Sequence, residues 1–449
     1  MNDESKPFLE SLKLQNLNCF AQIDLTFHNK LTVLVAPNGG GKTTVLDGAA
    51  VALRLFVDTM EGLAGSKGFH VSGVRRILSP DGKMEPVMPV RLEASGYPLG
   101  TRVEWARELR SEHASRTTTV EAQDLRGLAT RLSRENLDWV ERRIPDPPLF
   151  PLIAYYGTGR LWKMGSLTKG RKTRELSPNA RYRGYTDCLA PSSHYKMFED
   201  WFQRFSYEAR NENSPHEPER VLSAVRNAVN IGLALTGWRQ LEWDFAEKTI
   251  VAHHNLFGRL PVDFLSDGIR TMLGLVADVA HRATRLNPHF GEDAAAKTPG
   301  IVLIDEVDMH LHPEWQQVVL QTIQSAFPRV QFIVTTHSPQ VLTTVRKENV
   351  RILCCDEEGN GVASEPAYSP LAHESGDALA LIMETHPRPE IPVVLPDIHL
   401  YEQLARAGRG DTEEARQIKS RLDAAGFEFN DAELAFFKFL AGRADGKGK

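Results

Sequence analysis

The sequence predicts an α/β fold, and three observations support this prediction. Short apolar runs occur at residues 31–35, 300–304 and 332–335, each too short for a helix. A glycine-rich turn after the first run leads into a helical pattern over residues 42–55. A second helical pattern, over residues 314–327, separates the other two runs. Alternation of buried strands with helices is typical of a parallel sheet that helices cover on its faces.

The remaining elements follow from periodicity and turn residues. Apolar and polar residues alternate over residues 12–27, which predicts two half-buried strands joined by a turn. Prolines at residues 145–151 end an irregular region and lead into another apolar run. Further strands are expected at residues 87–94, 101–109, 149–156 and 238–251, and helices at residues 124–143, 193–206, 218–235, 267–285, 398–407, 412–425 and 431–440. The last three helices predict a small C-terminal helical appendage.

Composition and charge limit the class of protein. The chain has 449 residues, of which 41% are hydrophobic and 25% charged, as in ordinary globular proteins. No apolar run is long enough to span a membrane and no signal-peptide pattern opens the chain, so we expect a cytoplasmic protein without membrane contact. The four cysteines form no C-x-x-C pair and are expected to be reduced thiols. A net charge of −5 means that any site for a polyanion must be local.

One local segment, residues 160–183, is strongly basic. It holds eight lysines and arginines against the single acid Glu175, with glycines and serines interspersed. This composition predicts a loop rather than one face of a helix. Two interpretations stay open: a solvated surface loop, or a site for the phosphate backbone of nucleic acid. In the second case the contacts would come from Lys169, Arg171, Lys172 and Arg174.

A nucleotide-binding loop is predicted at residues 36–43. They match the pattern G-x-x-x-x-G-K-[ST], except that Ala36 replaces the first glycine. Glycines let several backbone N–H groups approach one anion. Lys42 would reach the β and γ phosphates of ATP, and the Thr43 hydroxyl would bind Mg²⁺. The residues expected to hold ATP here are Asn38, Gly39, Gly40, Gly41, Lys42, Thr43 and Thr44.

A pair of acids, Asp305 and Glu306, ends the apolar run at residues 300–304. At the carboxyl end of a central strand these acids can meet the cation held by Thr43. We expect Asp305 to hold Mg²⁺ and Glu306 to act as the general base for the attacking water. Taken alone, the two acids are also compatible with surface charge.

The run over residues 305–316, DEVDMHLHPEWQ, resembles the extended acidic-strand motif of bacterial ABC-type ATPases with soluble heads. The resemblance implies a P-loop NTPase fold of the ABC type, and it gives a role to two further segments. Residues 265–270 look like the family's signature sequence, in which Ser266, Gly268 and a helix start approach the γ-phosphate bound by a second subunit. Residues 335–339 resemble the switch segment, in which His337 contacts the γ-phosphate.

The same resemblance implies ATP and Mg²⁺ as cofactors and a head-to-tail homodimer that closes around ATP. The implied organisation is an ATPase head made of residues 1–55 and 262–350, an inserted helical and β lobe at 56–261, and a C-terminal helical region at 351–449. The glutamine that normally links Mg²⁺ to the inserted lobe has no clear counterpart, because residues 149–160 contain no glutamine.

Within this class, the chain resembles the ATPase subunits of Septu and retron-associated anti-phage defence systems, and its head is similar to those of RecF and overcoming-lysogenisation ATPases. This resemblance implies that the chain regulates a separate nuclease, of the HNH type. Residues 338–449 contain no D-x-D pair, which the nuclease domain of overcoming-lysogenisation relatives requires, so nuclease chemistry is expected on another chain. The alternative is a DNA-repair clamp of the RecF kind, in which the ATP-closed dimer itself grips DNA.

Overall fold

The chain forms two compact units, residues 1–384 and 385–449. Each unit has a hydrophobic core of its own. The four cysteines are free thiols. The computed structural model describes residues 8–60, 73–111, 118, 120–160, 178–190, 195–211, 217–383, 385, 391–392, 394–429 and 435–436.

A six-stranded sheet forms the centre of the larger unit. Every neighbouring pair of strands is parallel except β14 and β15. The register pairs Ile304 with Val334 on one side and with Tyr156 on the other. The loops that follow β3, β13, β12 and β8 therefore leave from the same edge of the sheet. In spatial order the strands are β15 (Gly361–Ser364), β14 (Val350–Cys355), β3 (Leu31–Val35), β13 (Val330–Thr335), β12 (Gly300–Ile304) and β8 (Leu152–Tyr156).

A second, antiparallel sheet lies on the other side of helix α1 (Lys42–Met60). The helix begins at the phosphate loop and contacts strands of both sheets, and α2 (Gln123–Val140) packs on it. The second sheet has the order β2 (Phe20–Thr26), β1 (Ser11–Leu17), β6 (Val90–Gly96) and β7 (Val103–Leu109). Residues 56–261, the expected insertion, thus supply two strands to this sheet and β8 to the six-stranded sheet.

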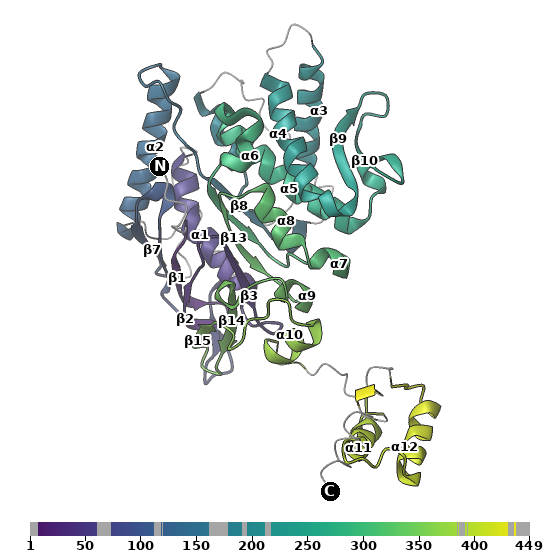
Figure 1. Cartoon of the computed structure of the whole chain (residues 1–449). Helices are drawn as coiled ribbons and strands as arrows, with labels where there is room; N and C mark the ends of the chain where they lie inside the picture. Colours follow the sequence, from purple (N-terminus) through teal and green to yellow (C-terminus); the bar gives the residue numbers. More distant parts are fainter. Residues whose placement is uncertain are drawn as a thin grey trace. The chain divides into compact units, whose positions relative to one another are not determined.

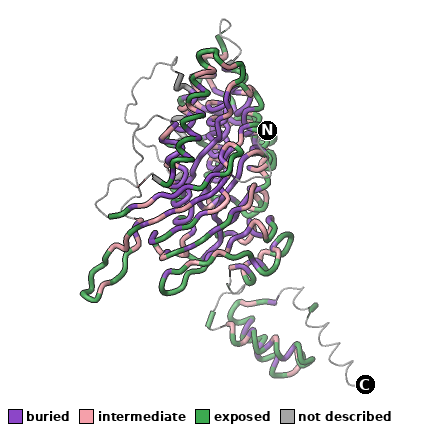
Figure 2. Tube along the Cα trace, turned by 90° about the vertical axis from the view of Figure 1, so that its left-hand side faces the viewer, coloured by how far each residue is buried: buried purple, intermediate pink, exposed green. Residues whose placement is uncertain are grey.

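Helix α5 (Asp267–Leu286) packs on β8, and further helices and a small sheet lie beyond it (Figure 1). Helix α5 also contacts α3 (Tyr195–Ala209) and α4 (Glu217–Gly232), and most of its residues are buried. The small sheet has the order β11 (Gly258–Pro261), β10 (Thr249–His254) and β9 (Trp238–Asp244). Figure 2 shows the buried residues running through the centre of the larger unit, with exposed residues along its outer elements. The expected α/β class is confirmed.

The smaller unit contains two described helices, α11 (Leu395–Arg406) and α12 (Glu413–Ala424). Its core is apolar and small, and an ion pair between Arg421 and Asp397, 2.6 Å apart, joins the two helices at the surface. The helix expected at residues 431–440 lies mostly outside the described residues.

Two differences from the predicted elements have simple causes. The pattern over residues 314–327 predicted one helix, whereas the structure has α7 (Pro313–Gln316) and α8 (Val319–Ala326). The break lies at Val318, whose φ of −124° is not helical, and the apolar period continues across it. The hairpin of β4 (Arg76–Leu78) and β5 (Met84–Pro86) is exposed and short, so it left no apolar pattern. Within the described ranges, none of the helices has the length and apolarity needed to cross a membrane.

Candidate nucleotide site

The phosphate loop requires glycine at specific positions. Gly39 and Gly41 have φ values of 78° and 86°, in the left-handed region that residues with a Cβ atom rarely adopt. A Cβ atom on Gly41 would also overlap the ring of Phe20, and one on Gly40 would lie 2.7 Å from the Cβ of Ala36. Because these positions carry no side chains, the backbone N–H groups of the loop can approach an anion closely.

Lys42 lies in the first turn of α1 and only 7% of it is exposed. Its ammonium group donates hydrogen bonds to the carbonyl oxygens of Ala36, at 2.8 Å, and Pro37, at 3.2 Å. Burial lowers the pKa of Lys42, and the nearby carboxylates of Asp305, Glu306 and Asp308 oppose this effect. The ammonium group is thus held against the backbone of the phosphate loop.

Asp305 follows β12 and is held by hydroxyl groups from two other segments. Thr43 donates to its Oδ2 at 2.9 Å, and Thr335, at the end of β13, donates to its Oδ1 at 2.6 Å. The structure therefore brings the expected cation ligands Thr43 and Asp305 together. The sequence reasoning did not identify Thr335 as their partner, because only the strand order places β13 beside β12.

Glu306 has a φ of 49°, so the chain turns sharply directly after Asp305. Its backbone N–H donates to Thr335 Oγ1 at 2.7 Å. The next N–H, of Val307, donates to the carbonyl of Thr335 at 2.9 Å. These contacts fix the backbone from which the half-buried Glu306 side chain extends.

His337 lies in the loop between β13 and α9 (Pro339–Leu342), and its side chain is exposed. The residues on either side are anchored: Thr336 donates to Asp308, and Ser338 donates to the Oε1 of Gln316 at 2.7 Å. This segment is therefore tied to the run at residues 305–316, at the same edge of the sheet as the phosphate loop.

The signature-like segment forms the start of α5. Ser266 is exposed at the N-cap position, and its side chain makes no capping hydrogen bond. Gly268 is buried, and a Cβ atom on it would overlap the carbonyl oxygen of His310. The start of α5 thus packs tightly on the loop that follows the acidic strand in the same chain.

The end of β8 occupies the place where a glutamine was expected. Tyr156 pairs with Ile304 in the parallel register, and its carbonyl accepts the N–H of Asp305 at 2.8 Å. The segment that follows, from Gly157, therefore leaves the sheet beside the two acids.

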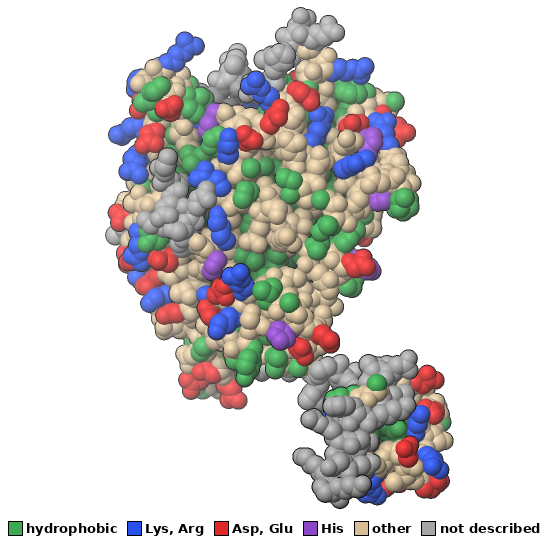
Figure 3. Space-filling view, viewed as in Figure 1, with side chains coloured by type: hydrophobic (Ala, Val, Ile, Leu, Met, Phe, Trp, Pro, Cys, Tyr) green, Lys and Arg blue, Asp and Glu red, His purple; other side chains and the backbone are tan. Residues whose placement is uncertain are grey.

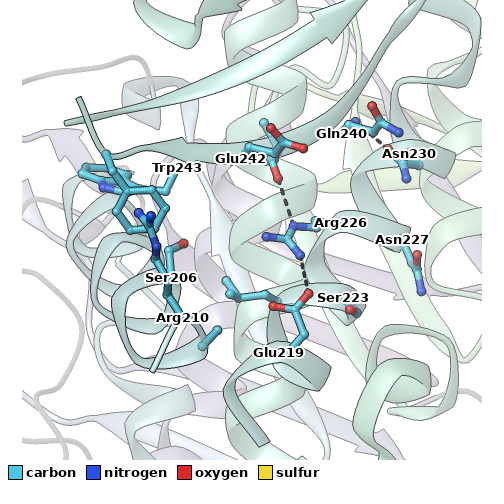
Figure 4. A pocket seen from close by; sticks show the side chains of 14 residues that line it. Ser206, Arg210, Glu219, Ser223, Arg226, Asn227, Asn230, Gln240, Glu242 and Trp243 are labelled. Atoms are coloured by element: carbon cyan, nitrogen blue, oxygen red, sulfur yellow. Dashed lines mark hydrogen bonds and ion pairs between the residues drawn. The ribbon is translucent and has the colours of Figure 1, made fainter. Parts of the chain in front are cut away.

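Two other features bear on binding. A polar groove of about 520 Å³ lies between α3, α4 and β9, but none of the residues expected to hold ATP lines it. Figure 4 shows Arg226 in this groove, where it donates to Glu219 at 2.7 Å and to the Leu241 carbonyl at 3.0 Å.

On the face in Figure 3, the described basic and acidic side chains are interspersed. Lys169, Arg171, Lys172 and Arg174 lie outside the described residues.

Comparison with known proteins agrees with this geometry. A family model described as "AAA domain" matches residues 11–204, and one described as "AAA domain, putative AbiEii toxin, Type IV TA system" matches residues 192–343. "Retron Vc95 probable ATPase" of Vibrio cholerae serotype O1 biovar El Tor is 25% identical, over 93% of this chain and 87% of its own length. The chain is a P-loop ATPase.

Two further relatives resemble the ATPase over most of their length. "Retron Ec83 probable ATPase" of Escherichia coli is 23% identical, over 92% of this chain and 82% of its own length. "Septu protein PtuA" of Bacillus thuringiensis is 22% identical, over 78% of this chain and 77% of its own length. The resemblance to retron and Septu ATPases expected from the motifs is confirmed.

Proposed function

We propose that this ATPase is the regulatory subunit of a bacterial anti-phage defence complex and controls a separate nuclease, of the HNH type. The observation that carries the proposal is the match to a retron ATPase along nearly the whole of both chains. The similarity extends beyond the nucleotide motifs into the helical region at residues 178–262, so the proteins share more than a generic ATPase head.

The geometry supports specific roles for the site residues. Thr43 and Asp305 offer a hydroxyl and a carboxylate 2.9 Å apart, which are the oxygen ligands that Mg²⁺ prefers. The amides of residues 38–44 and the Lys42 ammonium would hold the phosphates of ATP. Glu306 would accept a proton from the attacking water, and His337, exposed at the same edge, would contact the γ-phosphate. When bound, Mg²⁺ would neutralise charge that develops on the phosphates.

We infer that the working form is a head-to-tail dimer. Ser266 is exposed without a capping bond at the start of a 20-residue helix, and this helix end favours an anion. In the dimer, Ser266 and Gly268 of one subunit would complete the phosphate site of the other. A site assembled from two chains would let ATP control whether the complex is closed, and so control the partner.

A phage-challenge assay tests this function. The ATPase gene would be expressed with its neighbouring genes, and plaque formation compared between the parent and Lys42→Ala. We expect the variant to lose protection although it accumulates normally, and a tagged parent to co-purify a nuclease. Equal protection by both would reject the defence role. ATP-dependent binding of DNA by the isolated ATPase, with no partner recovered, would instead support the DNA-repair clamp.

A further inference from the structure

Two adjacent tyrosines at the end of β8 extend to opposite faces of the six-stranded sheet, because side chains alternate along a strand. Tyr155 and Tyr156 are buried, with exposures of 4% and 7%. The hydroxyl of Tyr155 donates a 3.0 Å hydrogen bond to Asp47 on α1. The hydroxyl of Tyr156 donates a 2.7 Å hydrogen bond to Asp278 on α5. One strand end therefore contacts both the helix that follows the phosphate loop and the helix that begins with the signature-like segment.

The first contact reaches the cation side of the nucleotide site. Asp47 lies four residues after Thr43, so both side chains are on the same face of α1, and both are exposed. Tyr156 adds a backbone contact, since its carbonyl accepts the N–H of Asp305. The end of β8 is thus bonded to Asp305, which is expected to hold Mg²⁺, and to α1 one turn after Thr43, the other expected ligand.

The second contact continues through α5. Arg282 donates from Nε to Asp278 at 2.8 Å, and from Nη1 to the carbonyls of Gly184 and Thr186, both at 3.0 Å. Burial alone would raise the pKa of Asp278, but Arg282, His281 and Tyr156 together hold this pKa below its ordinary value, so the carboxylate remains an acceptor. Burial, and next Asp278, raise the pKa of Tyr156 well above its ordinary value, so its hydroxyl remains a donor.

We propose that Tyr155 and Tyr156 are positioning residues that couple the nucleotide site to the signature helix α5. The proposal rests on the proposed assignment of that nucleotide site. In this chain, which has no glutamine at the end of β8, the strand end itself would carry the signal. Rearrangement of α1 and Asp305 around ATP would move β8, and the bond from Tyr156 to Asp278 would carry this movement to α5 and to residues 184–186.

We call the contacts from Asp47 through Tyr155 and Tyr156 to Asp278 the relay. Phenylalanine substitutions test it, because each removes one tyrosine hydroxyl and keeps the ring. The test variants are Tyr155→Phe, Tyr156→Phe and the double variant. The matched control is Tyr401→Phe, since Tyr401 is 8% exposed and belongs to the core of the smaller unit, outside the relay. ATP affinity would be measured by calorimetric titration, turnover by phosphate release, and the state of α5 by amide hydrogen exchange over residues 267–286 with and without ATP.

For each test variant, we expect turnover to fall by about 5-fold to 150-fold while affinity for ATP stays within about twofold of the parent. The ATP-induced change in exchange over α5 should be lost. Because the two hydroxyls would act in one relay, the double variant should turn over ATP no more slowly than the slower of the two single variants. Tyr401→Phe should behave as the parent does.

Three results would overturn the relay: an ATP-induced change over α5 that persists in both single variants, an equal loss in Tyr401→Phe, or effects that multiply in the double variant. Failure of the nucleotide-site assignment is recognised separately. In that case the parent would not bind ATP, or Lys42→Ala would bind it as tightly as the parent, before any tyrosine is changed.

Discussion

The hydroxyl of Thr43, next to the phosphate-loop lysine, donates a 2.9 Å hydrogen bond to the carboxylate of Asp305 at the end of β12. Thr335 holds the other oxygen of this carboxylate from β13. The start of α1 and the ends of β12 and β13 therefore meet at one carboxylate, because β3, β13 and β12 are neighbours in a parallel sheet. We expect ATP binding and hydrolysis to depend on this convergence and on the close packing around it.

Lys42→Ala should weaken ATP binding by at least about tenfold, since hydrogen bonds to charged groups contribute about 1.5 to 3 kcal/mol. Lys30→Ala is the matched control, because Lys30 also donates to a backbone carbonyl, that of Pro328 at 2.7 Å, but at an exposed position. Calorimetric titration with ATP and Mg²⁺ measures both. Equal affinity in the parent and Lys42→Ala would remove Lys42 from the site.

Glu306→Gln should bind ATP but hydrolyse it about 10² to 10⁴ times more slowly, because an amide cannot act as a general base. The variant should accumulate as a closed dimer with ATP, measured by light scattering after size exclusion. Glu247→Gln, which changes an exposed glutamate after β9, should turn over ATP at the parental rate. A Glu306→Gln protein that stays monomeric with ATP would contradict the dimer.

Gly41→Ala should destabilise the protein and abolish ATP binding. The left-handed φ costs about 1 to 2 kcal/mol for any residue with a Cβ atom, and here the Cβ would also overlap the ring of Phe20. Gly82→Ala measures the backbone cost alone, because Gly82 has a φ of 74° and nothing lies within 4 Å of its Cβ position. Urea unfolding should therefore show a larger loss for Gly41→Ala. Equal losses would mean that Phe20 moves aside.

Gly268→Ala should impair hydrolysis more than ATP binding. The added methyl would overlap the His310 carbonyl and displace the start of α5, which we propose completes the site of the second subunit. Gly376→Ala is the control, since Gly376 also lies in the first turn of a helix but has open space around its Cβ position. Turnover and affinity would be measured separately. A variant with parental turnover would show that the start of α5 is dispensable.

Neutralising Lys169, Arg171, Lys172 and Arg174 together tests the basic segment. If these residues contact phosphates, the slope of log affinity against log salt for nucleic acid should fall by about 0.7 to 0.9 for each lost contact. ATP binding should be retained, because the four residues lie outside the nucleotide motifs. An unchanged affinity and slope would make the segment a solvated loop.

The sequence predicted much of the fold, because the strongest patterns are local. The strand at residues 300–304 agrees with β12 residue for residue, and the helix at 267–285 agrees with α5 within one residue. A glycine-rich turn between a strand and a helix indicates phosphate binding through backbone geometry alone. The order of the motifs along the chain was therefore sufficient to predict an ATPase head.

Some of the weaker predictions failed because the pattern was short and exposed, or because a single residue interrupted it. β4 and β5 have three residues each and are largely exposed, so no apolar period marks them. The break at Val318 is a single residue inside a continuous apolar pattern. Periodicity reports which face of an element is buried, and it is insensitive to a local change of backbone angle.

By itself, the sequence determined the class of fold, the phosphate loop, the acidic pair and the ATPase activity that they indicate, because each depends on residues close together in the chain. Only the tertiary structure decided which groups meet: Thr335 with Asp305, Tyr155 with Asp47, and Tyr156 with Asp278. These partners are separated by 30, 108 and 122 positions. They meet because β8, β12 and β13 lie side by side in one register, and strand order is a property of the whole sheet that no local pattern encodes.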